Sequence, residues 1–492
     1  MKTIIILLSF MAATISCFGQ IHLGPGQSYP NIQYAAEANI IQPGDTVYLH
    51  SGSYAGYQMV TKLKGKEDNG IVICRFKNDI IDISGTWQFI SCEYIKFLNL
   101  NFKANTLHPG RLLSIDNGGS CETKSLYITV DSCSFSNTSD PTAITAFKLA
   151  GVDNFEVTNC SFKDFPVCDA MDFNVCHNGI IRGNRIQNCL SGGHIKGGSS
   201  NITMERNYFI NASKESWVAF ELGGDTGAEF YCPEDKFEVK NLKFYSNIVM
   251  GGYRGLALSS AVDCKVINNT FYNCGQATMR FLTTSTLFPT LSGNQVENNI
   301  FAFGASAYFN GGTQTAGAVS FSNNIYYSIM NVTFNGPYWD TPDLDAIKDK
   351  NPMNYGSGTK IFATSQSFEF KLIEGSPAIG TGKNEQEPAT DFYGNPFSST
   401  ARSIGAVEYI DNSAIDELSS SISIVFPNPA SSNLNIQTNS SGIQELIICN
   451  ILGECIFKEA ISGKRMVDVS SWSSGTYFVS INNEMRRIII QH

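Results

Sequence analysis

Short runs of alternating apolar and polar residues recur along most of the chain and are separated by Asn, Gly and Ser. Residues 179–184, 201–207 and 264–269 are three such runs. A period of two predicts β-strands of about three to five residues joined by tight turns, and these runs lack the spacing of an amphipathic helix. The pattern therefore predicts an all-β protein built from many short strands.

One phrase within these runs repeats: an Asn, one variable residue and then a large apolar residue. The phrase begins at Asn184, Asn207, Asn247, Asn269, Asn299 and Asn324, and at Cys133 and Cys160 in two earlier copies. Most copies lie about 22 to 30 residues apart, a period at which each repeat forms one unit of a solenoid. Asn suits the turns because it tolerates left-handed backbone angles. Stacked coils would place the Asn side chains in a ladder and the Phe, Ile and Cys side chains in inward stacks, so we expect a right-handed, single-stranded parallel β-helix.

The N-terminal part of the chain divides into three segments. Residues 1–20 combine an early lysine, an apolar run and small residues, which predicts a secretory signal peptide. Residues 21–60 hold a helix-like stretch at 32–38, which we expect to cap the open end of the first coil, since an uncapped solenoid exposes unpaired strand edges. The coils of the β-helix are then expected over residues 61–410.

After the coils the composition changes. Residues 411–425 include a run of serines and are expected to form a linker. Residues 426–492 alternate strand-like phrases with Gly and Ser turns, which predicts a small β-sandwich.

Composition narrows the class of partner. Charged residues make up 16% of the chain and the formal net charge is −10, so nucleic acid and anionic membrane surfaces are unfavourable partners. An anionic polymer is compatible with this charge, because a local basic groove can exist on an acidic protein. No segment beyond the signal peptide is apolar enough to cross a bilayer, and we expect a monomer.

Cysteines admit two interpretations. Thirteen of the fourteen cysteines follow the predicted signal peptide. An exported chain often forms disulfides. However, Cys92, Cys133, Cys160, Cys189 and Cys274 all lie beside a turn or an apolar strand residue, a register that favours stacked, buried thiols.

Outward-facing polar residues identify a candidate site. Where two apolar residues flank a polar one in a strand, the polar side chain faces outward, and equivalent residues of successive coils lie roughly 4.8 Å apart. This criterion predicts an outer ladder formed by Lys148, Asp172, Lys196 and Glu221, with Lys196 aligned only after a shift of one residue. Alternating charges also stabilise neighbouring strands, so a purely structural role remains open for each of them.

Several further residues flank this predicted ladder. His194 faces outward on the same strand as Lys196, and Asp169 and Arg254 lie near it in the sequence pattern. A long insertion over residues 223–240 contains Asp225 and Tyr231, and Trp217 precedes it. Tyr231 and Trp217 could stack on sugar rings, together with Lys148 and Glu221 as substrate-binding residues.

These residue types suit the cleavage of a uronate polymer by β-elimination. That reaction needs a group that neutralises the carboxylate, a base for the acidic C5 proton, and a proton donor for the leaving oxygen. Lys196 is the expected base, with His194 and Arg254 as further catalytic residues. A Ca²⁺ ion held by carboxylate oxygens could bind the uronate, and its expected ligands are Asp169, Asp172, Glu221 and Asp225.

Residues 21–60 resemble the N-terminal cap of secreted bacterial β-helix polysaccharide lyases, and residues 391–408 resemble a tail common in bacterial β-helix proteins. The resemblance implies a pectin-lyase-like fold. Residues 196–201, Lys-Gly-Gly-Ser-Ser-Asn, resemble the Lys-Ser-Ser-Asn stretch of alginate-lyase and chondroitinase-B-like enzymes, with two glycines inserted. That resemblance implies a catalytic role for Lys196. The partner arginine of those enzymes is replaced here by Glu221, for which Arg254 or Arg206 could substitute.

Two other functions stay open. Residues 189–199 resemble the Gly-His-Gly region of polygalacturonase-like glycoside hydrolases, and Asp169 and Asp172 lie about where that family's paired aspartates fall. Inverting hydrolysis needs two carboxylates with a water between them, and Asp172 with Glu221 could meet this requirement. That family's Asn-Thr-Asp and Arg-Ile-Lys phrases are absent. The third possibility is a non-catalytic glycan-binding or adhesin solenoid.

The C-terminal phrases at residues 426–430, 467–469 and 475–479 resemble, in their order, the type IX secretion C-terminal sorting domain of Bacteroidetes. The resemblance implies the type IX machinery as a partner. It also implies a product that is secreted or attached to the cell surface.

Overall fold

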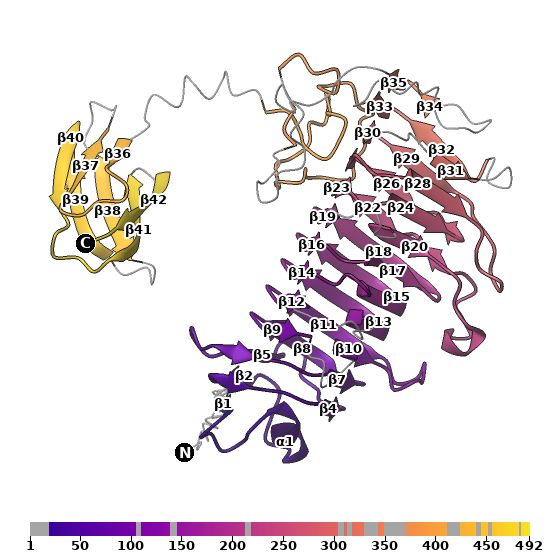
Figure 1. The fold of residues 1–492 in the computed structure, drawn as a ribbon, viewed down its shortest axis with the longest axis horizontal. Helices are drawn as coiled ribbons and strands as arrows, with labels where there is room; N and C mark the ends of the chain where they lie inside the picture. Colours follow the sequence, from indigo (N-terminus) through magenta and orange to yellow (C-terminus); the bar gives the residue numbers. More distant parts are fainter. Residues whose placement is uncertain are drawn as a thin grey trace, which may run out of the picture. The chain divides into compact units, whose positions relative to one another are not determined.

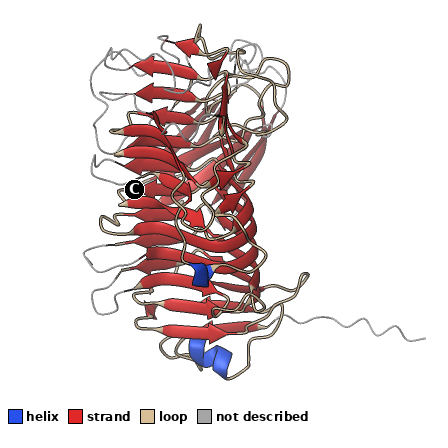
Figure 2. Cartoon of the chain, turned by 90° about the vertical axis from the view of Figure 1, so that its right-hand side faces the viewer, coloured by secondary structure: helices blue, strands red, loops and turns tan. Residues whose placement is uncertain are grey.

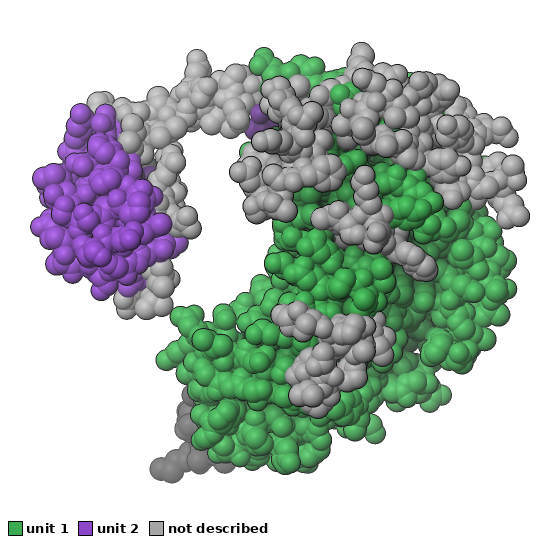
Figure 3. Space-filling model, viewed as in Figure 1, with its two compact units in different colours: residues 1–409 green, residues 410–492 purple. Residues whose placement is uncertain are grey.

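The computed structural model describes residues 19–104, 110–137, 145–211, 218–303, 309–311, 317–328, 343–348, 370–372, 374–410, 424–438, 444–450, 455–481 and 484–492. The chain separates into two compact units, Met1–Tyr409 and Ile410–His492, which have different colours in Figure 3. The predicted signal peptide falls almost entirely outside the described residues. Among the described helices, none combines the length and apolar character needed to span a membrane.

The first unit is a parallel β-solenoid whose stacked strands form three faces (Figures 1 and 2). Two long strands, β13 (Thr145–Thr158) and β15 (Asp169–Arg182), run from the first face into the second, so these faces make one continuous 23-stranded sheet. The third face is a separate 10-stranded sheet. This architecture confirms the predicted parallel β-helix.

The remaining strands of the first face are β4 (Gln58–Thr61), β7 (Trp87–Ile90), β10 (Arg111–Asp116), β17 (Ser191–Lys196), β20 (Phe220–Gly223), β24 (Arg254–Ser259), β28 (Ala277–Leu282) and β31 (Phe309–Gly311). Those of the second face are β1 (Gln20–Leu23), β2 (Thr46–Leu49), β5 (Ile71–Arg75), β8 (Glu93–Leu98), β11 (Ser125–Asp131), β18 (Ser199–Glu205), β21 (Val239–Lys240), β22 (Lys243–Tyr245), β25 (Ala261–Val262), β26 (Lys265–Ile267), β29 (Asn294–Glu297), β32 (Val319–Ser322) and β34 (Asp343–Leu344). Those of the third face are β9 (Asn101–Lys103), β12 (Ser134–Ser136), β14 (Ser161–Lys163), β16 (Arg185–Gln187), β19 (Tyr208–Asn211), β23 (Ile248–Gly251), β27 (Thr270–Tyr272), β30 (Ile300–Phe303), β33 (Ile325–Ser328) and β35 (Ile347–Lys348).

The repeated Asn residues form the predicted ladder at the turn between the second and third faces. In each coil the Asn Oδ1 accepts a hydrogen bond from the backbone N–H of the ladder residue one coil earlier, as in Asn207 N to Asn247 Oδ1 at 2.8 Å. The Nδ2 donates to a buried carbonyl, as in Asn207 Nδ2 to Ile181 O at 2.9 Å. The left-handed residue is the one before each ladder Asn, for example Arg206 and Ser246, so these asparagines are placed by the amide ladder and not by backbone tolerance.

The interior is filled by stacks of like residues. Phe102, Phe135 and Phe162 stack with ring centroids 5.0 and 4.7 Å apart. The five cysteines expected as buried thiols are all free and buried: Cys92, Cys133, Cys160, Cys189 and Cys274. Burial raises the pKa of the Cys92 and Cys189 thiols to about 12, which keeps them unreactive. One disulfide, Cys121–Cys232, joins loops that the sequence did not pair.

A helix covers the first coil, and a later segment covers the outside of the third face. The helix α1 (Ile32–Glu37) is capped by Asn31, whose side chain accepts from the Tyr34 N–H, and it buries Ile32 and Ala35 at the first coil (Figure 2). Residues 374–410 pack on the outside of the third face near the other end, where Ile404 joins an apolar cluster with strand residues. Shorter elements are the paired β3 (Gly52–Ser53) and β6 (Ile81–Asp82), and the 3₁₀-helix η1 (Ala228–Phe230).

The second unit is built from two antiparallel sheets around its own apolar core. One sheet contains β36 (Ile424–Phe426), β37 (Asn433–Gln437) and β40 (Lys464–Asp468). The other contains β38 (Gln444–Asn450), β39 (Cys455–Ile461), β41 (Gly475–Ile481) and β42 (Glu484–Ile490).

Candidate active site

A row of outward side chains crosses the first face and is here called the charged ladder. Strand register aligns its members one per coil: Lys148, Asp172, His194, Glu221, Ala257 and Arg280. The predicted ladder was therefore wrong at one position, because His194 and not Lys196 lies between Asp172 and Glu221. Lys196 aligns with Asn174 in the adjacent row, two residues further along each strand.

Asp172 is the centre of the charged ladder. Its Oδ2 accepts from Lys148 Nζ at 2.9 Å, and its Oδ1 lies 2.8 Å from His194 Nε2 and 2.6 Å from Asn174 Nδ2. The side chain is only 14% exposed. Both carboxylate oxygens are thus engaged by donors from three successive coils, which fixes the orientation of His194 and Lys148 over the sheet.

Asp169 stands on the other side of the same imidazole, with its Oδ2 3.6 Å from His194 Nδ1. Burial raises the pKa of Asp169, and the negative charge of Asp172 raises it further, against the opposing charges of His194 and Lys196. For Asp172, burial acts in the same upward direction, but the His194 hydrogen bond and the charges of His194 and Lys148 outweigh it and hold its pKa well below the ordinary range. Two neighbouring carboxyl groups therefore have pKa values shifted in opposite directions.

Lys196 lies at the end of β17 beside the 223–240 insertion. The structure records no hydrogen bond or ion pair for its ammonium within the described parts of the chain. The backbone next to Lys196 is held by Glu238. The N–H of the following residue, Gly197, donates to Glu238 Oε2 at 3.0 Å, and the Thr226 N–H donates to Glu238 Oε1 at 2.9 Å. Glu238 is fully buried, so it joins the insertion firmly to the turn after Lys196.

A pair of arginines occupies the other end of the charged ladder. Arg254 Nε donates to Gln276 Oε1 at 2.8 Å, and its guanidinium lies over the Tyr253 ring. Burial lowers the pKa of Arg280 and the positive charge of Arg254 lowers it further, whereas Glu221 acts in the opposite direction. Arg280 Nε is buried without a hydrogen-bond partner. Glu221 itself accepts a hydrogen bond from the Ser259 hydroxyl.

Arg280 is a site residue that the sequence reasoning missed. The signal was present, because Met279 and Phe281 flank it in the same apolar–polar–apolar pattern that identified Lys148 and Asp172. Arg280 lies one coil beyond Ala257 in the same row.

The insertion brings other predicted residues to places away from the charged ladder. Asp225 accepts hydrogen bonds from the N–H and hydroxyl of Thr286, at 2.9 and 3.1 Å, and so joins two loops. Tyr231 packs against Phe288 with centroids 5.0 Å apart, and burial together with Glu238 raises the pKa of its phenol. Its ring is used in loop packing. Trp217 lies outside the described residues.

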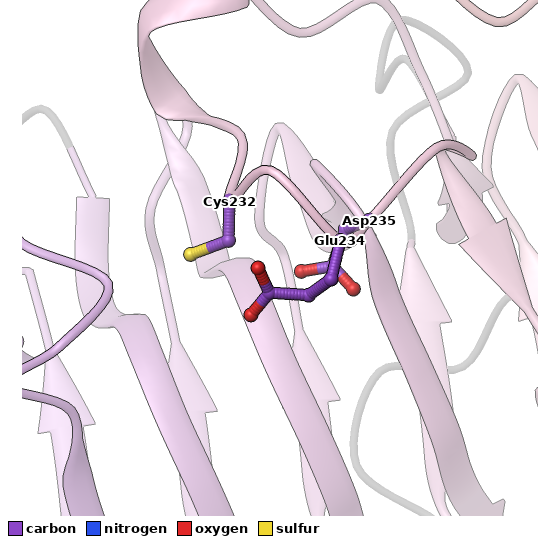
Figure 4. Close-up of side chains that lie close together, drawn as sticks. All are labelled: Cys232, Glu234 and Asp235. Atoms are coloured by element: carbon purple, nitrogen blue, oxygen red, sulfur yellow. The ribbon is translucent and has the colours of Figure 1, made fainter.

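The four carboxylates expected to hold Ca²⁺ are not gathered into one ligand set. Within the described residues, the only group of three or more His, Cys, Asp and Glu side chains close enough to share an ion is Cys232, Glu234 and Asp235 (Figure 4). Cys232 is bonded to Cys121, so its sulfur is not a thiolate ligand. Asp172 has both oxygens engaged by Lys148, His194 and Asn174, and Asp225 is held by Thr286. The residues present do not fit the expected calcium site, and no reaction step below depends on a metal.

Arg206, considered above as a substitute catalytic residue, has a structural role. It adopts a left-handed backbone with φ of 58°, and its Nε donates to Phe392 O at 3.3 Å.

Comparisons with known proteins assign the C-terminal part of the chain. Residues 424–491 match the family model described as the secretion system C-terminal sorting domain. The match confirms the predicted sorting domain and indicates type IX secretion to the cell surface or the extracellular space.

For the whole chain, a search of curated proteins gives no match. Among solved structures it is similar to pectate lyase Pel9A, with 13% identity and a TM-score of 0.44 over 80% of this chain and 97% of that one. It is also similar to a polygalacturonase from Erwinia carotovora ssp. carotovora, with 11% identity and a TM-score of 0.44 over 66% and 96% of the two chains. An alginate lyase from Paenibacillus sp. matches with 11% identity and a TM-score of 0.38 over 57% and 94%. These values describe fold only and do not identify a reaction.

Proposed function

We propose that the first face binds an anionic, uronate-containing polysaccharide and cleaves it by β-elimination. The observation that carries this proposal is a pair of cations on one sheet face with donor groups that lack a hydrogen-bond partner within the described residues: the Lys196 ammonium and the buried Nε of Arg280. Unpaired charge at a partly buried position is costly unless a ligand of opposite charge binds there. A uronate carboxylate supplies that charge.

The residues divide the steps of the elimination among them. Arg280, with Arg254 beside it, binds and neutralises the uronate carboxylate, which makes the C5 proton more acidic. Lys196, acting in its neutral form, takes this proton; the C5–H electrons form the C4–C5 double bond and the C4–O bond breaks. Asp169, whose pKa is raised by burial, donates a proton to the leaving oxygen. Asp172 keeps His194 and Lys148 in place with its two oxygens.

Small residues at the centre of the face leave room for a sugar. Ala257 separates Glu221 from Arg280 in the charged ladder, so the ladder position of that coil carries no bulky side chain. Gly223 and Gly224 follow Glu221, and a Cβ atom at Gly224 would lie 3.1 Å from the Lys196 side chain. A side chain at Gly224 would therefore crowd the proposed base.

A glycoside hydrolase is the second candidate, and the opposite pKa shifts of Asp169 and Asp172 favour it. Hydrolysis with inversion needs one protonated carboxyl group as acid and one ionised carboxylate as base. Asp169 would be the acid, and Asp172 or Glu221 the base. Both Asp172 oxygens already accept hydrogen bonds from protein donors, so Asp172 is poorly suited to act as a base. For this reason we rank the lyase above the hydrolase.

The test is an assay of the protein without residues 1–20 on alginate, pectin, chondroitin and heparin-type polymers. A lyase produces unsaturated ends, so ultraviolet absorbance rises, and Lys196→Ala should lower the rate about 10²- to 10⁴-fold. Lys240→Ala, an exposed lysine on the second face, is the matched control and should leave the rate unchanged. New reducing ends without absorbance, lost in Asp172→Asn, would replace the lyase by the hydrolase. Binding without any cleavage would contradict both.

A further inference from the structure

The second face carries a column of left-handed residues at its start, one per coil, close to the turn from the first face. In order along the solenoid these residues are Tyr94, Tyr127, Asn154, Asn178, Asn201, Asn241 and Asp263, with φ between 52° and 58°. Asn, Asp and Gly adopt such angles at low cost, whereas a bulky residue there is an outlier. In four successive coils Asn occupies this position, so Asn is sufficient for the left-handed backbone of the turn. The presence of two tyrosines therefore calls for an explanation other than folding of the turn.

The tyrosines form an aromatic platform that is half-buried at Tyr94 and exposed at Tyr127. Their rings are stacked with centroids 4.4 Å apart and planes 8° from parallel, and Tyr127 is 45% exposed. Beyond Tyr127 the column continues with the smaller Asn154 and Asn178, so the aromatic stack ends beside open space. No other aromatic residue of the described chain occupies this column.

A cavity of about 530 Å³ lies along this platform and is here called the tyrosine groove. It is lined by both tyrosines and by polar side chains, among them Asn154, Asn178 and Glu156. The structure records no hydrogen bond or ion pair for the exposed Glu156 carboxylate within the described residues. The volume lies in the range of pockets that bind small ligands, and the lining combines stacking surface with a few hydrogen-bonding groups.

The charges of the tyrosine groove differ from those of the charged ladder. Its charged lining residues are Glu67, Lys96 and Glu156, and the Lys96 ammonium lies 3.6 Å from the Asp131 carboxylate. The groove is therefore slightly acidic and has no unpaired cation to hold a carboxylate. A ligand that stacks on phenol rings and presents hydroxyl groups to carboxylate and amide oxygens fits it.

We propose that the tyrosine groove is a second, non-catalytic glycan site that binds pyranose residues of a neutral polysaccharide. The apolar face of a sugar ring packs on Tyr127 at the open end of the stack, and its hydroxyls bond to Glu156, Asn154 and Asn178. The groove lies on the second face, so a chain bound there leaves the charged ladder accessible. The site would attach the exported protein to a neutral glycan and does not depend on the reaction proposed for the first face.

The test is affinity electrophoresis of the chain without residues 1–20 in native gels containing galactomannan, xyloglucan or mixed-linkage glucan, with alginate and pectin gels beside them. The key variant is Tyr94→Asn with Tyr127→Asn, which installs the residue that the next four coils use, so the fold is retained. We expect retardation by at least one neutral polymer, and a loss of apparent affinity of tenfold or more in this variant. Tyr34→Ala, at an exposed tyrosine of the N-terminal cap, should bind like the wild type.

Glu156→Gln gives a second test that leaves both rings in place and should weaken retardation severalfold. Thermal unfolding followed by circular dichroism checks that each variant is folded. Retardation by no neutral polymer would overturn the proposal, as would unchanged retardation in the folded Tyr94→Asn, Tyr127→Asn variant. Retardation by uronate polymers alone, lost in that variant, would overturn the assignment to neutral sugars.

Discussion

The first and second faces of the solenoid share the same coils and even the same strands, yet their outer surfaces differ in kind. On β13, Lys148 lies on the first face and Glu156 on the second, a few residues further along. The first face gathers fixed charges from successive coils around Asp172, and leaves the Lys196 ammonium and the Arg280 Nε without a hydrogen-bond partner within the described residues. The second face carries stacked tyrosines and then asparagines.

The difference shows how a repeat fold separates architecture from chemistry. Inward residues and the buried Asn ladder are repeated because every coil must stack on the next. Outward residues are free to vary, since each occupies one coil without altering the register. A parallel β-helix can therefore present one surface suited to an anionic polymer and another suited to neutral sugars.

Removing the carboxylate at the centre of the charged ladder should strongly reduce stability. Asp172→Asn leaves Lys148 and His194 without their shared counter-charge in a mostly buried position, and we expect a loss of about 2–4 kcal/mol in the free energy of unfolding. Denaturant unfolding measures this loss. The matched variant on the second face is Asp153→Asn, which breaks one pair with Lys124 at 3.1 Å and should cost about 1 kcal/mol or less. Equal losses in the two variants would contradict the claim that Asp172 stabilises the charged ladder more than an ordinary surface ion pair does.

The opposite pKa shifts predict opposite responses to pH. The raised pKa of Asp169 means that its ionised form is disfavoured by folding, so Asp169→Asn should raise the melting temperature at pH 7. Its unfavourable contribution is present above its folded pKa and disappears as pH falls towards the ordinary value of about 3.9.

The lowered pKa of Asp172 contributes stability above the ordinary value of about 3.9, and this contribution is lost as pH falls through its folded pKa. Melting temperatures from pH 3 to pH 8 for both Asn variants measure the two contributions. If both variants changed the melting temperature in the same direction at neutral pH, the opposite pKa shifts of Asp169 and Asp172 would be contradicted.

Removing the Arg280 cation should affect substrate binding more than stability. Arg280→Ala removes the proposed carboxylate contact, and we expect KM for the uronate polymer to rise about tenfold or more, with weaker dependence on salt. Steady-state rates at several salt concentrations measure this. Arg182→Ala, which removes a cation paired with Glu205 on the second face, should leave KM unchanged. A fall in kcat alone would place Arg280 outside substrate binding.

Breaking the Cys121–Cys232 disulfide should have the smallest effect on chemistry. The bond holds the 223–240 insertion to the loop that precedes β11. Because Glu238 also anchors the insertion to Gly197, we expect Cys121→Ser with Cys232→Ser to lower stability by about 2–4 kcal/mol while changing KM by less than about threefold. Abolished turnover in the folded double variant would show that the insertion positions the reacting groups.

Much of the fold could be predicted because its determinants are local and repeated. The Asn phrase identified the coils, the ladder and the buried thiols, since the same physical requirement recurs in each turn. The alignment of the charged ladder failed at β17 because Gly193 occupies an inward position without a side chain there, where a Cβ atom would lie 2.0 Å from Met171 O. Without an inward apolar residue at that point, His194 and Lys196 could not be ordered from the sequence.

Other site features depend on contacts between distant residues. The Cys121–Cys232 bond joins positions 111 residues apart, and a set of cysteines does not reveal its pairing. Asp225 and Tyr231 fit a binding role by residue type. In the structure, however, Asp225 accepts a hydrogen bond from Thr286 and Tyr231 packs against Phe288, so both side chains hold loops together. Tertiary contacts of an insertion have no repeated pattern from which to infer them.

The most direct test of the separation between faces is to measure the initial rate of ultraviolet absorbance on the responding uronate polymer for three proteins. These are the wild type, Lys196→Ala and the Tyr94→Asn, Tyr127→Asn variant. We predict that Lys196→Ala loses at least a hundredfold in rate, while the tyrosine variant stays within about twofold of the wild type. An undiminished rate in Lys196→Ala, or a large loss in the tyrosine variant, would contradict the division of catalysis and glycan attachment between the two faces.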